Sequence, residues 1–354
     1  QEGVAYYQRM IRSGKRHSAA TGFLHPALSR SNLHLRAHAH VTRVNSENGH
    51  VVGVSYQMDG DTYHARARRE TLLCAGAISS PHLLQVSGIG PGTLLQNLNI
   101  PIVHDSPGVG EGLQDHYAVR VSQRINAPIS LNHRSSGFRL LWEIIRWYLN
   151  GSGLLAFSPA HVGAFLRTDP ESSVPDLQFA FTPASYAKSA DPTGKLHPYP
   201  GITCGVWQLV PTSRGYVRAH SPDPLKSPAI QPNYLATTTD QLAVVRGLKW
   251  CRTLLNTDAL KPYLADEILP GTNYQQDSDL LTYASNSGTT VYHPVGSCRM
   301  GTDAMAVVDP HLKLRGMTGL RVVDASVMPT MVSGNTNATT LMIAEKASEL
   351  ILNQ

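Results

Sequence analysis

One histidine and one asparagine near the carboxyl end are suited to removing a proton and holding the resulting oxygen. His293 lies in the run VYHPVGSCRMG at residues 291–301, where Pro294 and Gly296 constrain its turn. Asn337 follows 44 residues later, in the polar run GNTN that opens a helical pattern. A neutral imidazole, with a pKa near about 6.5, accepts a proton at physiological pH, and an amide hydrogen-bonds an oxygen. The pair predicts proton abstraction from a bound hydroxyl group.

Each residue also has a structural interpretation. A lone histidine is more often a satisfied core residue than a catalytic base, and asparagine is a preferred helix cap. Three further runs decide between these alternatives: GAISSPHLLQVSGIGP at 76–91, GVGEGLQDH at 108–116 and VVDASVMP at 322–329. Together with the histidine segment they closely resemble the glucose–methanol–choline (GMC) family of FAD-dependent alcohol oxidoreductases, in particular its choline-dehydrogenase-like branch.

The resemblance implies a cofactor, a substrate class and a mechanism. The cofactor would be FAD, and the substrate a small-molecule primary alcohol that is oxidised to an aldehyde. His293 would be the catalytic base and Asn337 the residue that holds the substrate oxygen, while a hydride passes to flavin N5. Which alcohol is oxidised, and whether oxygen or another acceptor takes the electrons, is not readable from these motifs. No metal site is expected.

The resemblance also marks positions close to the cofactor, which are Val41, Tyr292, Asp324, Ala325, Asn337, Ala338 and Thr339. The helix after Asn337 would aim its backbone N–H groups and the positive end of its dipole at the flavin. Structural alternatives remain for three positions. Asp324 could cap the next turn, Val41 could be ordinary strand filling, and Tyr292 could simply pack.

A dinucleotide-binding motif is missing from the expected place. Such flavoproteins begin with a strand, a G-x-G-x-x-G turn and an acidic residue about 20 residues later, and nothing before residue 40 has that form. The resemblance covers nearly all of this chain but only the carboxyl-terminal two thirds of the family's length. Either the sequence is a fragment, or a complementary N-terminal chain carries the GxGxxG motif.

The length of 354 residues predicts two domains of an α/β (α+β) fold. We expect part of an FAD-binding doubly wound domain at residues 1–114 and an antiparallel-sheet substrate-binding domain with flanking helices at 115–290. Residues 291–354 would return to the FAD-binding domain with the catalytic His and Asn. In the first region, period-two residues 32–44, an Asn48-Gly49 turn and residues 51–56 predict a hairpin, and residues 69–77 predict a buried strand that leads into a helix from Ser80.

Later segments are assigned by periodicity. We expect helices at 138–149, at 239–255 and from about Thr340. Strands are expected at 162–166, 176–181, 202–209, 214–219 and 320–323. The helix at 138–149 is amphipathic, with Leu141, Ile144, Ile145 and Tyr148 opposite its charged side chains.

Charge and composition exclude other classes of protein. The net charge of +5 includes no run of Lys or Arg, so nucleic-acid binding is not expected. Residues 147–166 lack charge for most of their length but are broken by Gly and Pro, so no membrane span is expected. Four cysteines without a CxxC pair predict reduced, buried thiols. No signal peptide is apparent, and the localisation is left unassigned.

Two rival functions remain open. A flavin-dependent lyase or photodecarboxylase could share the fold, although His293 disfavours the decarboxylase and an asparagine in place of a second histidine disfavours the lyase. The other rival is a catalytically silent fragment that binds a partner chain, which the missing phosphate loop suggests. The yellow absorbance of bound flavin would separate an enzyme from a silent fragment.

Overall fold

The computed structural model describes residues 2–186 and 195–353. The chain forms two compact units, each made of segments that are distant in the sequence. Unit 1 comprises residues 1–35, 117–209 and 238–290, and unit 2 comprises residues 36–116, 210–237 and 291–354. The mixture of helices and strands agrees with the expected fold class.

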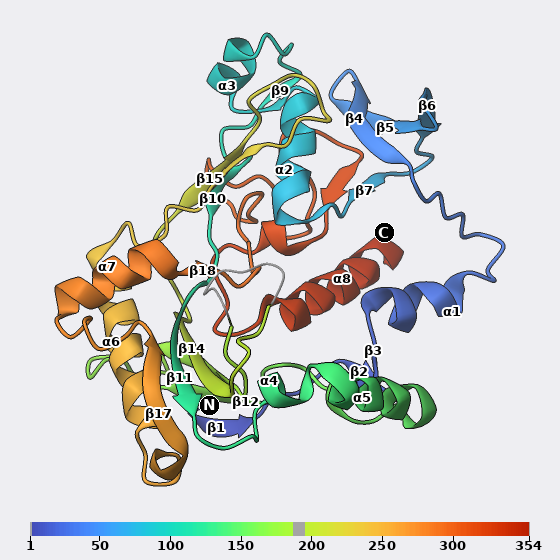
Figure 1. Ribbon diagram of the computed structural model, residues 1–354. Helices are drawn as coiled ribbons and strands as arrows, with labels where there is room; N and C mark the ends of the chain where they lie inside the picture. Colours follow the sequence, from blue (N-terminus) through green and yellow to red (C-terminus); the bar gives the residue numbers. More distant parts are fainter. Residues whose placement is uncertain (1, 187–194, 354) are drawn as a thin grey trace. The chain divides into compact units, whose positions relative to one another are not determined.

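Unit 1 is built on one antiparallel sheet (Figure 1). Its strand order is β1-β12-β13-β14-β11-β17, and β18 pairs with β11. The strands are β1 (Gly3–Tyr6), β11 (Tyr117–Ile125), β12 (Val162–Leu166), β13 (Leu177–Thr182), β14 (Gly201–Gln208), β17 (Leu264–Leu269) and β18 (Thr289–Thr290). The helix α6 (Thr238–Leu255) packs on β14 and β11, because Val244, Leu248, Cys251 and Leu255 recur at helical spacing and are buried. The helix α7 (Asp277–Ser287) packs on α6.

Shorter elements complete unit 1. They are the hairpin β2 (Ile11–Arg12) and β3 (Lys15–Arg16), the π-helical turn η1 (Ala20–Leu24), α1 (His25–Ala27), α4 (Leu131–Arg134), α5 (Gly137–Asn150), and the 3-10 turns η2 (Leu154–Ala156) and η3 (Lys261–Tyr263). The helix expected at 138–149 is confirmed as α5, which ends where Gly151 takes a left-handed φ of 60°. Its orientation is unusual, because its apolar side chains face outward.

Unit 2 contains an antiparallel sheet of β4 (His40–Glu47), β5 (His50–Met58) and β6 (Asp61–Arg66). The predicted hairpin is confirmed. Asn48 and Gly49 both have positive φ, 49° and 77°, as the tight turn between β4 and β5 requires. A second antiparallel sheet contains β10 (Glu111–Leu113), β15 (Gly215–Arg218) and β16 (Ala229–Gln231). The parallel pair β8 (Ile89–Gly90) and β9 (His104–Asp105) flanks the short helix α3 (Gly92–Asn97).

A second parallel pair in unit 2 has the strand-to-helix order of a doubly wound fold. β7 (Thr71–Leu73) pairs with β19 (Leu320–Val322), and each strand runs into a helical segment. The helix α2 (Gly76–Val86) follows β7, and the 3-10 turn η4 (Ala325–Val327) follows β19. The last helix, α8 (Thr336–Leu352), contacts η4, and the core between these elements includes Leu84, Val322 and Val327. The carboxyl ends of both strands therefore meet at one edge, where such folds bind ligands.

The observed units differ from the expected domain boundaries in two places. Residues 1–35 belong to unit 1, since β1 pairs with β12 in the register Gly3 to Phe165. Residues 210–237 belong to unit 2, since β15 pairs with β10 and β16 rather than with the large sheet. Assigning either unit to the cofactor or the substrate remains a prediction.

Some local expectations were also wrong. The strand expected from residue 32 begins at His40, and the helix expected from Thr340 begins at Thr336. Cys74 is exposed, whereas Cys204, Cys251 and Cys298 are buried as expected, and all four are free thiols. Hydrophobic periodicity marks the middle of an element better than its ends, which accounts for both boundary errors.

A buried ion pair fixes β19 beside β7, which predicts a large effect on stability. The Arg321 side chain is fully buried, and its Nε donates to Glu70 Oε2 at 2.9 Å. Replacing Glu70 with Gln leaves this buried charge without its counter-ion, and the free energy of unfolding should fall by about 3 kcal/mol in urea titrations. The matched control is Glu47→Gln in the exposed pair with Arg66, which should cost under about 1 kcal/mol. Equal losses in both variants would contradict this account.

Candidate active site

The histidine segment of unit 2 is held against residues 114–116. Gln114 and Val295 exchange two backbone hydrogen bonds, at 3.0 and 2.9 Å, and the Val291 N–H donates to the His116 carbonyl at 3.2 Å. The His293 N–H in turn donates to Asp115 Oδ1 at 2.9 Å. The backbone is thus held by hydrogen bonds at His293 and two residues before and after it.

Both ring nitrogens of His293 have partners. His293 Nδ1 lies 3.0 Å from Nδ1 of His116, a fully buried residue, and the two rings are nearly perpendicular. His293 Nε2 lies 3.2 Å from Nδ2 of Asn335. An amide nitrogen only donates, so Nε2 must accept and the ring proton sits on Nδ1. Nδ1–H then donates to His116. This arrangement leaves a basic lone pair on Nε2, directed at the amide.

Asn335 is a residue that the sequence interpretation missed. It occupies the N-cap position of α8. Within the described residues 195–353, which include all of α8, its side chain makes no capping hydrogen bond to this helix. Its amide is turned to His293 instead. The predicted partner, Asn337, lies two residues further on, exposed in the first turn of α8. The helix start was placed four residues too late, and the repeated asparagine in GNTN hid the difference between the two positions.

Burial sets the proton affinity of His293. Desolvation lowers the pKa of this imidazole below its ordinary value, and the nearby Asp115 carboxylate opposes part of that shift. Asp115 is itself buried and accepts a hydrogen bond from the Tyr234 hydroxyl at 2.5 Å. The ring is therefore neutral at pH 7, as a base must be.

The same short run also fixes the entry to α8. Gln114 Oε1 accepts from the Met331 N–H at 2.9 Å, and Gln114 Nε2 donates to the Pro211 carbonyl at 2.6 Å. Met331 lies four residues before Asn335 on the segment that leads into α8. Residues 114–116 thus hold both His293 and the segment that leads to Asn335.

Asp324 lies at the shared edge of β7 and β19. Its Oδ2 accepts from the Gly76 N–H at 2.9 Å and from Ser80 Oγ at 2.6 Å, while Oδ1 accepts from the Ser326 N–H at 2.8 Å. The capping role raised as an alternative is therefore what these bonds show: Asp324 ties the start of η4 to the start of α2. Its contact with a cofactor stays a prediction.

The remaining predicted positions are spread over unit 2. Val41 is in β4 opposite Tyr56, and Ala325 begins η4. Tyr292 is 77% exposed and has a positive φ of 61°, which is unusual for a bulky residue and accompanies the sharp turn before His293. Ala338 is exposed and Thr339 half-buried, both in the first turn of α8. The structure brings the predicted base together with Asn335, and it places these other residues at separate points.

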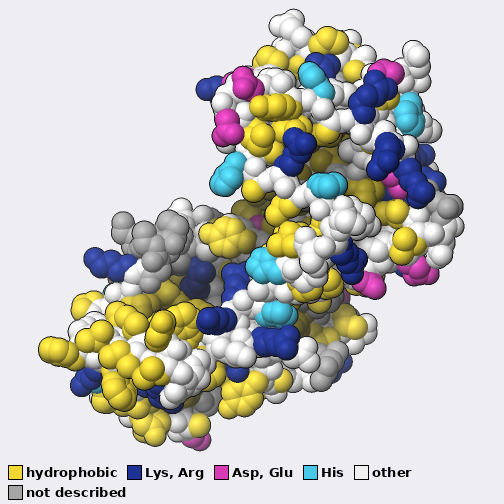
Figure 2. Space-filling view, turned by 90° about the vertical axis from the view of Figure 1, so that its right-hand side faces the viewer, with side chains coloured by type: hydrophobic (Ala, Val, Ile, Leu, Met, Phe, Trp, Pro, Cys, Tyr) yellow, Lys and Arg dark blue, Asp and Glu magenta, His cyan; other side chains and the backbone are white. Residues whose placement is uncertain are grey.

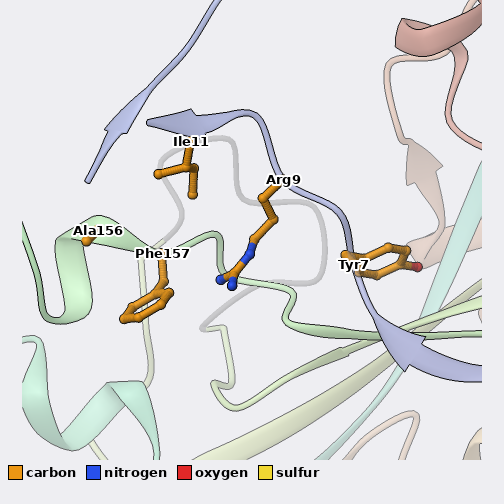
Figure 3. A pocket seen from close by; sticks show the side chains of 5 residues that line it. All are labelled: Tyr7, Arg9, Ile11, Ala156 and Phe157. Atoms are coloured by element: carbon orange, nitrogen blue, oxygen red, sulfur yellow. The ribbon is translucent and has the colours of Figure 1, made fainter. Parts of the chain in front are cut away.

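A pocket of about 350 Å³ lies in unit 1 (Figure 3). Tyr7, Arg9, Ile11, Ala156 and Phe157 line it. The Arg9 guanidinium carbon is 5.2 Å from the centroid of the Phe157 ring, close enough for a cation–π contact. Phe157 is thus an aromatic residue of this pocket. By contrast, Phe179 and Trp207 are buried in the core of the sheet.

Comparisons with known proteins agree with the motifs. Two family models described as GMC oxidoreductase match residues 1–118 and 211–344. The chain is 41% identical to the oxygen-dependent choline dehydrogenase of Pseudomonas putida (strain F1), over 99% of this chain and 62% of that protein. It is 39% identical to the mitochondrial choline dehydrogenase of Homo sapiens, over 100% of this chain and 59% of that protein.

Solved structures show the same fold. Pyridoxine 4-oxidase from Mesorbium loti superposes with a TM-score of 0.87 at 29% identity, covering 100% of this chain and 65% of that one. A formate oxidase from Aspergillus oryzae gives 0.91 at 24% identity, covering 99% and 65%, which is a likeness of fold alone. The chain thus spans about three fifths of the length of the curated relatives.

The electrostatics of His293 predict its titration. Burial holds its pKa below about 6.5, and the Asp115 carboxylate favours the imidazolium form. Asp115→Asn removes that charge while its amide oxygen still accepts from the His293 N–H, so the pKa should fall further. NMR titration of labelled imidazoles, assigned with His293→Gln, measures the shift, and Asp59→Asn in an exposed turn is the control. A pKa for His293 that rises in Asp115→Asn would refute the assignment.

Proposed function

We propose that this chain, which belongs to the GMC oxidoreductase family, oxidises the hydroxyl group of a small primary alcohol to an aldehyde in an FAD-dependent reaction. The observation that carries the proposal is the contact of His293 Nε2, an acceptor on a half-buried ring, with the Asn335 amide. The chain spans about three fifths of the length of its relatives, so the activity is proposed for the whole protein.

The first step assigned to these residues is proton removal. A substrate hydroxyl placed between His293 Nε2 and Asn335 Nδ2 donates to the ring and accepts from the amide. The ring takes the proton, and the amide then stabilises the negative charge that develops on the oxygen. The two nitrogens lie 3.2 Å apart, so they must separate slightly to admit the hydroxyl between them.

His116 acts as a positioning residue in this proposal. Its Nδ1 accepts the Nδ1–H of His293, which selects the tautomer in which Nε2 carries no proton. When His293 becomes an imidazolium, the same bond and the Asp115 carboxylate stabilise the positive charge. In this proposal, residues 114–116, 293 and 335 supply every group that the proton transfer needs. The hydride acceptor comes from elsewhere.

Bound FAD would supply that hydride acceptor. The first turn of α8, with Asn337, Ala338 and Thr339, offers backbone N–H groups and the positive end of the helix dipole to an electron-rich ring. The edge shared by β7 and β19, with Asp324 and Ala325, suits the pyrophosphate and ribityl chain. Val41, in β4, is the proposed adenine contact, and Tyr292 a flavin contact. The N–H groups at the start of α8 thus suit an anionic ligand.

A complementary segment would complete the cofactor domain. β7 and β19 form a sheet of two parallel strands, and Leu72 in β7 is 45% exposed. Parallel sheets are normally covered on both faces and contain more strands. Further strands and the GxGxxG turn would come from this segment. The same exposed surface supports a second candidate, a silent fragment that serves only in assembly, and flavin content of the assembled protein decides between them.

Loss of the base should abolish most turnover. In the complete, FAD-loaded protein, His293→Ala should lower kcat by about 10²–10⁴-fold, because the proposed acceptor of the hydroxyl proton is lost. Flavin absorbance should persist, and His25→Ala, at an exposed histidine of unit 1, is the control. Turnover near that of the wild type in His293→Ala would remove the proposed mechanism.

Substitutions at the two asparagines test which one holds the oxygen. Asn335→Leu removes a donor at the developing charge and should raise the barrier by about 2.7–4 kcal/mol, a loss of about 10²–10³-fold in kcat. Asn335→His retains a donor and should keep more activity. Asn337→Leu, two residues away, is the matched comparison, and steady-state rates are normalised to flavin content. A larger loss in Asn337→Leu than in Asn335→Leu would return the role to Asn337.

A further inference from the structure

A tyrosine from another segment of unit 2 reaches the carboxylate that holds His293. The Tyr234 hydroxyl donates to Asp115 Oδ2 at 2.5 Å, and the other oxygen, Oδ1, accepts from the His293 N–H at 2.9 Å. Tyr234 belongs to residues 210–237, the middle segment of unit 2. One carboxylate therefore links this tyrosine to the backbone of the proposed base, with a donor on each of its two oxygens.

Asp115 lies away from water, which is unusual for an acidic residue. It is 7% exposed, whereas Figure 2 shows other Asp and Glu side chains at the surface of the molecule. A buried carboxylate is unfavourable unless hydrogen bonds or opposite charges compensate for the lost water. A donor to such a group also matters more than one at the surface, because solvent does not replace it. The Tyr234 hydroxyl is therefore one of the groups that keep Asp115 in place beside His293.

The backbone on both sides of Tyr234 is strained. Asn233 and Leu235 have positive φ angles of 57° and 58°. Asparagine tolerates this left-handed conformation, but a bulky residue such as leucine rarely adopts it. Strain of this kind persists only where surrounding contacts hold it, and it is concentrated at functional sites. The strained turn is the one that presents Tyr234 to Asp115.

Hydrogen bonds to neighbouring residues hold this turn. Asn233 Nδ2 donates to the Arg214 carbonyl at 2.9 Å, and Asn233 Oδ1 accepts from Gln231 Nε2 at 3.0 Å. The Ala236 N–H donates to Ser213 Oγ at 3.1 Å. The turn is therefore a fixed part of unit 2, and its tyrosine is a rigidly mounted donor.

The acceptor of Tyr234 distinguishes it from tyrosines with a structural role. The hydroxyls of Tyr7, Tyr117 and Tyr283 donate to backbone carbonyls, at 2.8, 2.8 and 2.7 Å, and so satisfy polar groups of the fold. Tyr234 donates instead to a carboxylate, whose rotation about the Cβ–Cγ bond has only broad preferences of its own. A donor on each oxygen fixes that rotation.

The turn at His293 depends on a fixed carboxylate. Tyr292, the residue before it, has a positive φ of 61°, so the His293 N–H emerges from a strained turn. Asp115 Oδ1 accepts from that N–H, and the ring then directs Nε2 to the Asn335 amide at 3.2 Å. Rotation of the carboxylate would release the N–H and with it the direction of the ring. A displacement of about 1 Å at a reacting group can lower a rate by about 10²-fold.

We propose that Tyr234 is a positioning residue for His293 and acts through Asp115. Its hydroxyl holds the carboxylate in the orientation in which Oδ1 fixes the turn at His293, and this turn directs Nε2 to the substrate oxygen. In this role Tyr234 contacts neither the substrate nor the transferred proton. The inference rests on the proposed function of His293 as the base and extends it to the middle segment of unit 2.

Hydrogen exchange of the His293 amide tests the link without turnover. In the complete, FAD-loaded protein, Tyr234→Phe removes the hydroxyl and keeps the ring. The His293 N–H, followed by NMR in labelled protein, should then exchange about fivefold faster, because its acceptor is held less firmly. Tyr283→Phe is the matched control, since it removes a hydroxyl bond to the Arg120 carbonyl in unit 1 and should leave this exchange unchanged. Unchanged exchange in Tyr234→Phe, or equal acceleration in both variants, would overturn the proposal.

Steady-state kinetics test whether the link matters for the reaction. Tyr234→Phe should lower kcat by about tenfold with little change in KM, because the base is misdirected while substrate binding is kept. Tyr283→Phe should keep the wild-type kcat. In Asp115→Ala the hydroxyl has lost its acceptor, so adding Tyr234→Phe should lower kcat no further, and additive losses would contradict action through Asp115. Circular dichroism verifies folding, and the exchange comparison decides by itself if Asp115→Ala does not fold.

Comparison with His293→Ala separates the role of Tyr234 from that of the base. A large loss of kcat in His293→Ala beside a wild-type kcat in Tyr234→Phe would overturn the role of Tyr234 alone. Wild-type turnover in His293→Ala would overturn the proposed function, and the positioning role of Tyr234 with it.

Discussion

The candidate site depends on the hydrogen bonds of three consecutive residues, Gln114, Asp115 and His116. Gln114 holds Met331 ahead of α8, Asp115 holds the His293 backbone, and His116 orients the His293 ring. All three are buried, so each of these bonds would be costly to leave unmade. Two segments of unit 2 that are about 40 residues apart in the sequence are thereby fixed to one strand end. A base and a donor so fixed need little rearrangement to meet an alcohol, which is the physical meaning of preorganisation.

The requirements of this site conflict with those of the helix that it uses. Asparagine at an N-cap normally satisfies an N–H of the first turn, and forgoing that bond costs about 1 kcal/mol. Asn335 directs its amide to His293 instead. The N–H groups of the first turn then keep more of their capacity for an anionic ligand. A less stable helix end is thus consistent with a role in binding.

Much of the fold followed from local patterns, and the exceptions have physical reasons. The Asn48-Gly49 turn was predicted correctly, and α5 and α6 were predicted within one residue at each end, since turn chemistry and periodicity are local properties. The pairing of β1 with β12 joins residues about 160 apart and leaves no local sign. His293 was predicted from its motif, but Asn335 and His116 emerged only when the structure placed their side chains. The outward direction of α5 was equally hidden, because an amphipathic pattern does not say which face meets the protein.

The anchoring of α5 separates two properties that usually change together. Its inner contacts include the hydrogen bonds of Glu143 and Trp147, whereas outer side chains such as Phe138, Tyr148 and Leu149 are largely exposed. Exchanging one outer apolar residue for another should therefore leave folding almost unchanged. The outer surface of this helix could then change in small steps while the hydrogen bonds of Glu143 and Trp147 keep the helix in place.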